Sequence, residues 1–254
     1  MRGDSEQLGK QSVDDIITVA FRQYRRHLEL LYPFLGFGIV SLVLEFRFEL
    51  LLSLFEIDRS FSVTANPDPL RDLLSEPVSD AVAPVLEEIF VLLLLGILSL
   101  FAFTLLVFLF AAGITFLVAS DEGRENAERT QSARAVAVTR RLPALFAASL
   151  IGAVLIAAGS LLFVLPGLYL ASRLVLGGPA IVIDGYGPLA GLREGWRRSS
   201  GQLFEVFAVS IGGAAVVSVV GFVPLIGEAV SVLVLMPVFL LALGNLYLDG
   251  PATR

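Results

Sequence analysis

The sequence predicts an all-α integral membrane protein: six transmembrane helices, an N-terminal amphipathic interfacial helix and short cytoplasmic elbow helices. The first observation behind this prediction is composition, because 56% of the 254 residues are hydrophobic, only 17% are charged, and the mean hydropathy is +0.82. The second is an uncharged run over residues 89–119, and the third is a series of further apolar segments. About 20 apolar residues suffice for a helix to cross the ~30 Å hydrocarbon core. The chain therefore belongs to the multi-span membrane class.

An amphipathic helix is expected over residues 13–28, within an N-terminal cytoplasmic segment of residues 1–27. Its apolar residues recur at helical spacing, and Ser12 followed by Asp15 is typical of a capping box at a helix start. Such a helix either lies on anionic headgroups or a partner, or forms an elbow that stabilises the start of the first span. The apolar face consists of Val13, Ile16, Ile17, Ala20, Phe21, Tyr24 and Leu28.

The membrane domain is expected over residues 28–248, followed by a cytoplasmic tail of residues 249–254. Its six spans are predicted at about 28–54, 89–119, 142–165, 168–183, 203–223 and 225–248. Residues 56–84 contain four prolines and indicate a solvent-exposed cap or loop, whereas Pro166-Gly167 and residues 224–227 predict tight turns. Small residues are frequent in spans three and five, which we expect to be the central helices because small faces allow close packing in lipid.

The distribution of basic residues orients these spans. Only Arg59 and Arg71 lie in the segments predicted outside, and the positive-inside rule then places both termini on the cytoplasmic side of the membrane. Two further amphipathic elbows are expected on the inner side at about 128–141 and 188–198. In the second, Leu189, Leu192 and Trp196 are expected to share one membrane-facing side. The inner segments hold Arg2, Lys10, Arg22, Arg25, Arg26, Arg124, Arg129, Arg134, Arg140, Arg141, Arg193, Arg197, Arg198 and Arg254.

Arg173 lies inside the short predicted span four, where an arginine costs roughly 2.5 to 3.5 kcal/mol on insertion scales. It therefore needs a partner or a route to water. Glu228 is the first candidate partner, and Glu45 and Glu49 are further candidates for an intramembrane polar site near the outer end. This group is either a pocket for an anion, a proton or a lipid headgroup, or a structural ion pair. Helix kinks or motif positions are expected at Gly177, Gly178, Pro179, Asp184 and Trp196.

Enzyme, metal and cofactor signatures are missing from the sequence. There is no cysteine and one histidine, His27, so thiolate and imidazole metal sites are excluded. Phosphate-loop, nucleophile-elbow and zinc-protease motifs do not occur. We expect no catalytic residue, no cofactor and no nucleic-acid partner. The expected partners are membrane lipids and a protein at the cytoplasmic face.

One stretch, residues 171–207, resembles the membrane-domain family found fused to some glycerophosphodiester phosphodiesterases, and related six-span proteins of bacteria and archaea. The resemblance implies a six-helix membrane domain of a prokaryotic cell membrane without phosphodiesterase activity, and it carries over no catalytic residue. Gly195 stands where that pattern has serine. The positions that match are Arg173, Pro179, Asp184, Leu192, Trp196 and Gly201.

The leading functional hypothesis is a non-enzymatic scaffold or accessory subunit that presents its cytoplasmic elbows. The alternative is a carrier for a lipid or small anion with Arg173 in its pathway. A lipid-modifying enzyme has the least support, because no converging nucleophile, base or metal set is visible.

Overall fold

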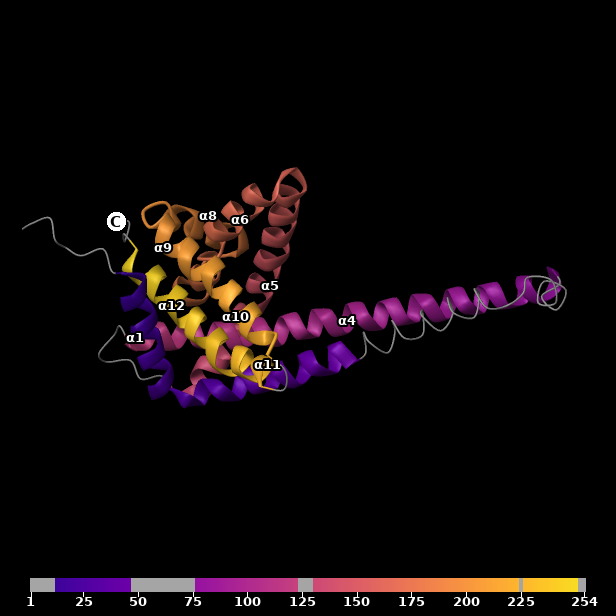
Figure 1. The fold of residues 1–254 in the computed structure, drawn as a ribbon, viewed down its shortest axis with the longest axis horizontal. Helices are drawn as coiled ribbons and strands as arrows, with labels where there is room; N and C mark the ends of the chain where they lie inside the picture. Colours follow the sequence, from indigo (N-terminus) through magenta and orange to yellow (C-terminus); the bar gives the residue numbers. More distant parts are fainter. Residues whose placement is uncertain (1–11, 47–75, 123–129, 224–225, 251–254) are drawn as a thin grey trace, which may run out of the picture. The chain divides into compact units, whose positions relative to one another are not determined.

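A computed structural model describes residues 12–46, 76–122, 130–223 and 226–250, and Figure 1 shows these parts as helices. The described residues contain no strand, and six of their helices are long and apolar enough to cross a membrane. These spans are Leu28–Phe46, Leu94–Asp121, Gln131–Leu161, Val164–Asp184, Leu203–Gly221 and Gly227–Asp249. The predicted all-α fold with six spans is confirmed. Glu49 and most of the predicted proline-rich loop lie outside the described residues.

The chain divides into two compact units. One unit combines Met1–Gly38 with Leu106–Arg254, and the other is Ile39–Leu105. The second unit contains the end of span one and most of α4 (Glu76–Glu122). Its large apolar side chains, Leu98 and Phe101 among them, are exposed as lipid-facing residues would be. The predicted loop was wrong for residues 76–84, which are helical; Pro77 is tolerated because the first turn of a helix needs no N–H donor there.

The N-terminal helix α1 (Val13–Arg26) packs against α12 (Met236–Asp249), and a 3-10 turn, η1 (Leu28–Leu30), leads from it into span one. Ile16, Ala20 and Tyr24 are buried as expected, but Phe21 is exposed. The Tyr24 hydroxyl donates to the Leu233 carbonyl at 2.6 Å. The helix begins just after Ser12 as predicted, although the Ser12 side chain makes no capping hydrogen bond. Its apolar face therefore contacts protein, which favours the elbow interpretation.

Helices α5 (Gln131–Leu162) and α6 (Val164–Leu174) pack against each other as a helical hairpin. The predicted turn at Pro166-Gly167 was wrong, because the only break is the extended residue Phe163. Pro166 lies in the first turn of α6, where proline is tolerated. Gly167 instead allows close packing, since a Cβ there would lie 3.1 Å from the Ser160 Cα. The predicted elbow at 128–141 was also wrong, because residues 131–141 continue without a break into α5.

Span four ends irregularly. Helix α6 is followed by α7 (Gly177–Pro179) and by the π-helical segment η2 (Ala180–Asp184), after which α8 (Pro188–Ser199) begins. Gly185 ends η2 with a φ of 81°, a left-handed conformation that favours glycine. Helix α8 confirms the predicted second elbow. It packs against α5, α6, α7 and η2, so it is part of the bundle.

The last two spans also contain π-helical segments. Span five consists of α9 (Leu203–Phe207), η3 (Ala208–Gly212) and α10 (Gly213–Gly221), and span six of α11 (Gly227–Val230), η4 (Ser231–Leu235) and α12. The prediction that spans three and five are central was wrong. The buried share is 44% in span four and 50% in span six, against 22% in each of spans three and five. Small residues give α5 one tight face against α6, but spans four and six have neighbours on several sides.

Candidate functional site

Arg173 lies on α6 and points to α8. Its Nε donates to the Tyr169 hydroxyl at 3.0 Å and its Nη1 donates to Ser200 Oγ at 2.8 Å. The guanidinium carbon is 5.1 Å from the Tyr169 ring centroid and 5.4 Å from that of Trp196. Cation–π contacts of this kind stabilise an arginine without a carboxylate. The structure thus brings together two predicted positions, Arg173 and Trp196.

Neither of the predicted carboxylate partners that the structure describes, Glu228 and Glu45, joins Arg173. Within the described residues Arg173 forms no ion pair, and Glu228 is exposed on α11, which belongs to span six. Glu45 is exposed in the smaller unit. The pairing with Glu228 was wrong because Arg173 extends toward the polar groups of α8, where its donors are satisfied close by.

Helix α8 packs against the stretch Gly177, Gly178, Pro179, where the helix of span four is irregular. A Cβ at Gly195 would meet the Gly177 backbone nitrogen and lie 2.7 Å from the Leu176 carbonyl carbon. A Cβ at Gly177 would in turn lie 3.2 Å from the Leu192 Cα. Two backbones therefore touch here, which explains the glycine that stands in place of serine at position 195.

Asp184 contributes to a polar network at the same end of the bundle. The Tyr247 hydroxyl donates to Asp184, and the Arg198 guanidinium lies 3.9 Å from the Tyr247 ring centroid. Arg198 Nε donates to Glu194 Oε1 at 2.8 Å, and its Nη1 donates to the Tyr247 carbonyl at 2.7 Å. Gln202 Nε2 donates to the Leu246 carbonyl at 2.6 Å. Both carbonyls lie in the last turn of α12, and the Leu246 carbonyl also accepts from the Gly250 N–H at 3.1 Å.

Glu194 anchors α8 in this network. Its side chain is 9% exposed and accepts hydrogen bonds from Arg197 and Arg198. The hydrogen bond from Arg197 is the main cause that holds the pKa of this carboxyl below its usual range, against the opposing effect of burial. Charge-assisted bonds of this kind are the strong ones. Glu194 therefore stays ionised and joins two arginines of its own helix.

A second charged cluster, which sequence reasoning missed, joins three segments. Arg134 near the start of α5 is 5% exposed. Its Nε donates to Asp121 Oδ2 at 3.0 Å and its Nη1 donates to Glu29 Oε1 at 2.5 Å. We call Glu29, Asp121 and Arg134 the Arg134 junction. Only the proximity of three charged residues to three predicted span ends on the same side could have indicated it from the sequence.

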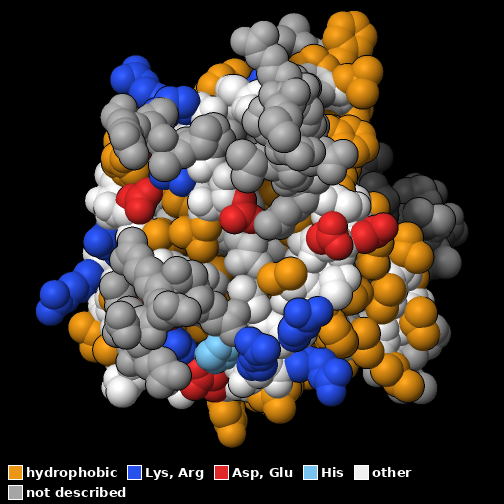
Figure 2. Space-filling model, turned by 90° about the vertical axis from the view of Figure 1, so that its left-hand side faces the viewer, with side chains coloured by type: hydrophobic (Ala, Val, Ile, Leu, Met, Phe, Trp, Pro, Cys, Tyr) orange, Lys and Arg blue, Asp and Glu red, His pale blue; other side chains and the backbone are white. Residues whose placement is uncertain are grey.

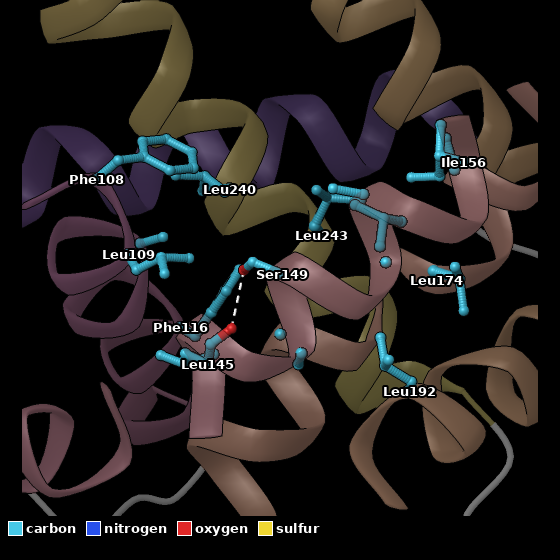
Figure 3. A pocket seen from close by; sticks show the side chains of 17 residues that line it. Phe108, Leu109, Phe116, Leu145, Ser149, Ile156, Leu174, Leu192, Leu240 and Leu243 are labelled. Carbon is cyan, nitrogen blue, oxygen red and sulfur yellow. Dashed lines mark hydrogen bonds between the residues drawn. The ribbon is translucent and has the colours of Figure 1, made fainter. Parts of the chain in front are cut away.

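An apolar cavity of about 410 Å³ lies within the larger unit, between α4, α5, span four, α8 and α12. Figure 3 shows that its labelled side chains come from all these elements, and that the Ser149 hydroxyl is bonded to the Leu145 carbonyl. The distance of that bond is 2.9 Å, so the serine offers no free donor. Gly152 is buried in the wall, yet a Cβ there would meet no atom within 4 Å. The volume falls in the range of about 300–1,000 Å³ typical of ligand pockets.

Arg173 is not part of this cavity. The wall contributed by span four includes Ala171, Leu174, Val175 and Gly178. At about 100° per residue these positions share one helical face, and Arg173 lies on the opposite one. The polar site predicted around Arg173 and the apolar cavity are therefore separate features.

The outer face of α8 carries basic and apolar side chains together. Leu189 and Trp196 are exposed as predicted, but Leu192 is buried and lines the cavity, so the shared face was wrong for that residue. Figure 2, which views the side where α1 and the end of α12 lie, shows basic side chains gathered beside the histidine and next to hydrophobic ones. The exposed arginines of α1, α5 and α8 that make no ion pair with a described carboxylate are Arg22, Arg25, Arg26, Arg140 and Arg193.

Among the described residues, no group of three histidine, aspartate or glutamate side chains is placed to hold a metal ion. The clustered carboxylates are instead bound by arginines, as in the Arg134 junction. Comparison with protein-family models, with curated proteins and with solved structures finds no match to this chain.

Proposed function

We propose that this chain is a non-enzymatic scaffold or accessory subunit of a prokaryotic cell membrane, with both termini in the cytoplasm. The observation that supports this proposal is that some arginines are bonded inside the bundle whereas others are exposed on its surface. Arg134, Arg141 and Arg198 bind carboxylates or helix-end carbonyls inside the bundle. The exposed Arg22, Arg25, Arg26, Arg140 and Arg193 make no ion pair with a described carboxylate, and we propose that they bind a partner of opposite charge.

Hydrogen bonds from Arg198 and Gln202 hold α8 against the end of α12, and a surface held in this way favours binding. Side chains that cap α12 and span four fix the position of α8, so a partner meets a preformed arrangement of exposed charges. Preorganisation lowers the entropy lost on association. Complementary charges also steer a partner and raise the rate of its association. The proposed partner is therefore a protein with an acidic face on the cytoplasmic side.

Native mass spectrometry of the protein, extracted gently from its own membranes, tests this proposal. We expect a protein partner at fixed stoichiometry, which is lost from the double variant Arg25→Glu, Arg193→Glu. The matched control is Glu228→Arg, a charge reversal at an exposed residue of the predicted outer end. A wild-type protein that carries no stoichiometric protein partner contradicts the scaffold proposal, as does equal loss in the control.

A lipid carrier is the second candidate function, and the apolar cavity favours it. Its pathway would not include Arg173, which lies on the opposite face of α6. Lipid exchange between vesicles and the reconstituted protein tests this candidate. Exchange that Gly152→Leu abolishes and that Arg173→Gln leaves unchanged would support it, whereas exchange no faster than in protein-free vesicles would exclude it.

A further inference from the structure

Among the described residues, Arg141 is a charged neighbour of the apolar cavity. Leu145, Ala148 and Gly152 line the cavity from α5, and Arg141 lies four residues before Leu145 on the same helical face. Arg141 Nη1 donates to the Ile181 carbonyl at 2.9 Å. Arg141 thus lies about one turn beyond the cavity wall, and its guanidinium contacts the end of span four.

The backbone at this end is shaped around the Arg141 guanidinium. Gly185 has a φ of 81°, and a Cβ there would lie 2.8 Å from the Arg141 Cζ. The cation therefore rests against bare backbone at the end of span four. Its side chain is partly exposed, and one of its nitrogens is committed to the Ile181 carbonyl. A guanidinium held in this way retains donors for a second acceptor, because it carries five N–H groups.

We infer that the cavity holds one acyl chain of an anionic phospholipid, with the lipid phosphate beside Arg141. At bilayer depth an apolar cavity borders hydrocarbon, so a lipid chain is its natural occupant. Apolar contact alone gives little preference for protein over lipid, because lipid tails are as apolar as the cavity wall. The selective contribution comes from Arg141 and the phosphate, a pairing for which guanidinium is well suited. This inference requires a bound lipid and no transport, so it holds for a scaffold as well as for a carrier.

The site can be tested by filling it. Protein is reconstituted with an equal mixture of phosphatidylglycerol and phosphatidylcholine, extracted, and examined for retained lipid by native mass spectrometry. Gly152→Leu places a side chain in the cavity, and we expect it to lower retained lipid about tenfold, which is about 1.4 kcal/mol, because the added side chain takes the space of the acyl chain. The control is Gly212→Leu, also at a helical glycine with no atom within 4 Å of its Cβ but exposed. Equal retention in both variants would overturn the assignment.

A second pair of variants tests whether the lipid phosphate lies beside Arg141. Arg141→Gln is expected to lower the ratio of retained phosphatidylglycerol to phosphatidylcholine about fivefold, because one arginine near an anionic lipid is worth about 1 kcal/mol. Arg140→Gln is the control, since Arg140 is the adjacent exposed arginine. An unchanged ratio in Arg141→Gln would overturn the placement of the phosphate.

A measurement on wild-type protein removes any dependence on the folding of variants. Phosphatidylglycerol with a photoreactive diazirine in its acyl chain is expected to label the buried cavity residue Phe116. Labelling confined to exposed residues such as Val154 would show surface lipid only and overturn the inference. Failure of the scaffold proposal would appear as a missing protein partner and would leave all three lipid results unchanged.

Discussion

The Arg134 junction and the Arg173 site stabilise an arginine within the helical bundle by different contacts. Arg134 is 5% exposed and binds two carboxylates contributed by other segments, Glu29 and Asp121. Arg173 is partly exposed and binds a tyrosine and a serine hydroxyl beside two aromatic rings. An arginine closed off from water needs counter-charges, because an unpaired buried charge is very costly. One that reaches the polar edge of the bundle needs only hydrogen-bond acceptors and ring faces.

The largest loss of stability is expected from Arg134→Met. It would leave two carboxylates without their common cation, and breaking a buried ion pair costs about 3–5 kcal/mol. The free energy of unfolding in detergent, measured with the same denaturant series for each variant, checks this. Arg140→Met changes an exposed arginine of the same helix and should stay within about 0.5 kcal/mol of wild type. Equal effects at the two positions would show that the junction is not a stabilising contact.

A smaller loss of stability is expected from Gly195→Ala. This variant tests the Arg173 side of the comparison, because Gly195 allows α8, and with it Trp196, to lie close to span four. The added methyl would meet the backbone of Gly177 and push α8 away, at about 1–3 kcal/mol for an overpacked contact. Gly187→Ala is the control, since a Cβ there meets nothing within 4 Å. Thermal unfolding midpoints of the two variants measure the difference. A Gly195→Ala protein as stable as the control would disprove the backbone contact.

Arg173→Gln should reduce stability by less than about 1 kcal/mol, because exposed polar and cation–π contacts are weak. Trp196 is the single tryptophan of the chain and lies beside Arg173, so its fluorescence emission should shift when the cation is removed. Glu228→Gln should leave the emission unchanged and should not restore the stability of the Arg173 variant. Restoration would revive the ion pair between Arg173 and Glu228.

The smallest expected effect is a dependence of stability on pH. The pKa of Glu194 is lowered in the folded protein, chiefly by its hydrogen bond from Arg197. The resulting stabilisation is complete above the ordinary glutamate pKa of about 4.3 and is lost as the pH falls through the lower folded value. Unfolding midpoints of wild type and Glu194→Gln should therefore differ at pH 7 and converge under acid conditions. A constant difference at every pH would rule out this linkage.

Hydropathy was sufficient to predict the six spans, the N-terminal helix and α8, because long apolar runs and helical periodicity are local properties. It could not place side chains. Arg134 stands in a polar stretch and gave no sign of burial, whereas Arg173 stands in an apolar one and looked more isolated than it is. The turn at Phe163 was missed for a similar reason. Pro166 and Gly167 are common in turns, but here they serve the start and the packing face of α6.

The cavity could not be predicted from the sequence either. Its wall combines residues of five segments, and their convergence depends on the packing of Gly178 against Phe116 and of Leu192 against Gly177. Neither contact has a sequence pattern. Arg141 appeared only as one of many cytoplasmic arginines until its position next to Gly185 was known.

We propose that the Arg134 junction and α8 lie on the same, cytoplasmic side of the membrane. The chain has no cysteine, so a single introduced thiol reports its own position. Exposed Ser132, Ala190 and Phe163 are changed to cysteine one at a time and treated with a membrane-impermeant maleimide in intact cells and in inverted vesicles. We predict that Ser132→Cys and Ala190→Cys react only in inverted vesicles and Phe163→Cys only in cells. Reaction of Ser132→Cys and Ala190→Cys from opposite sides would contradict the account.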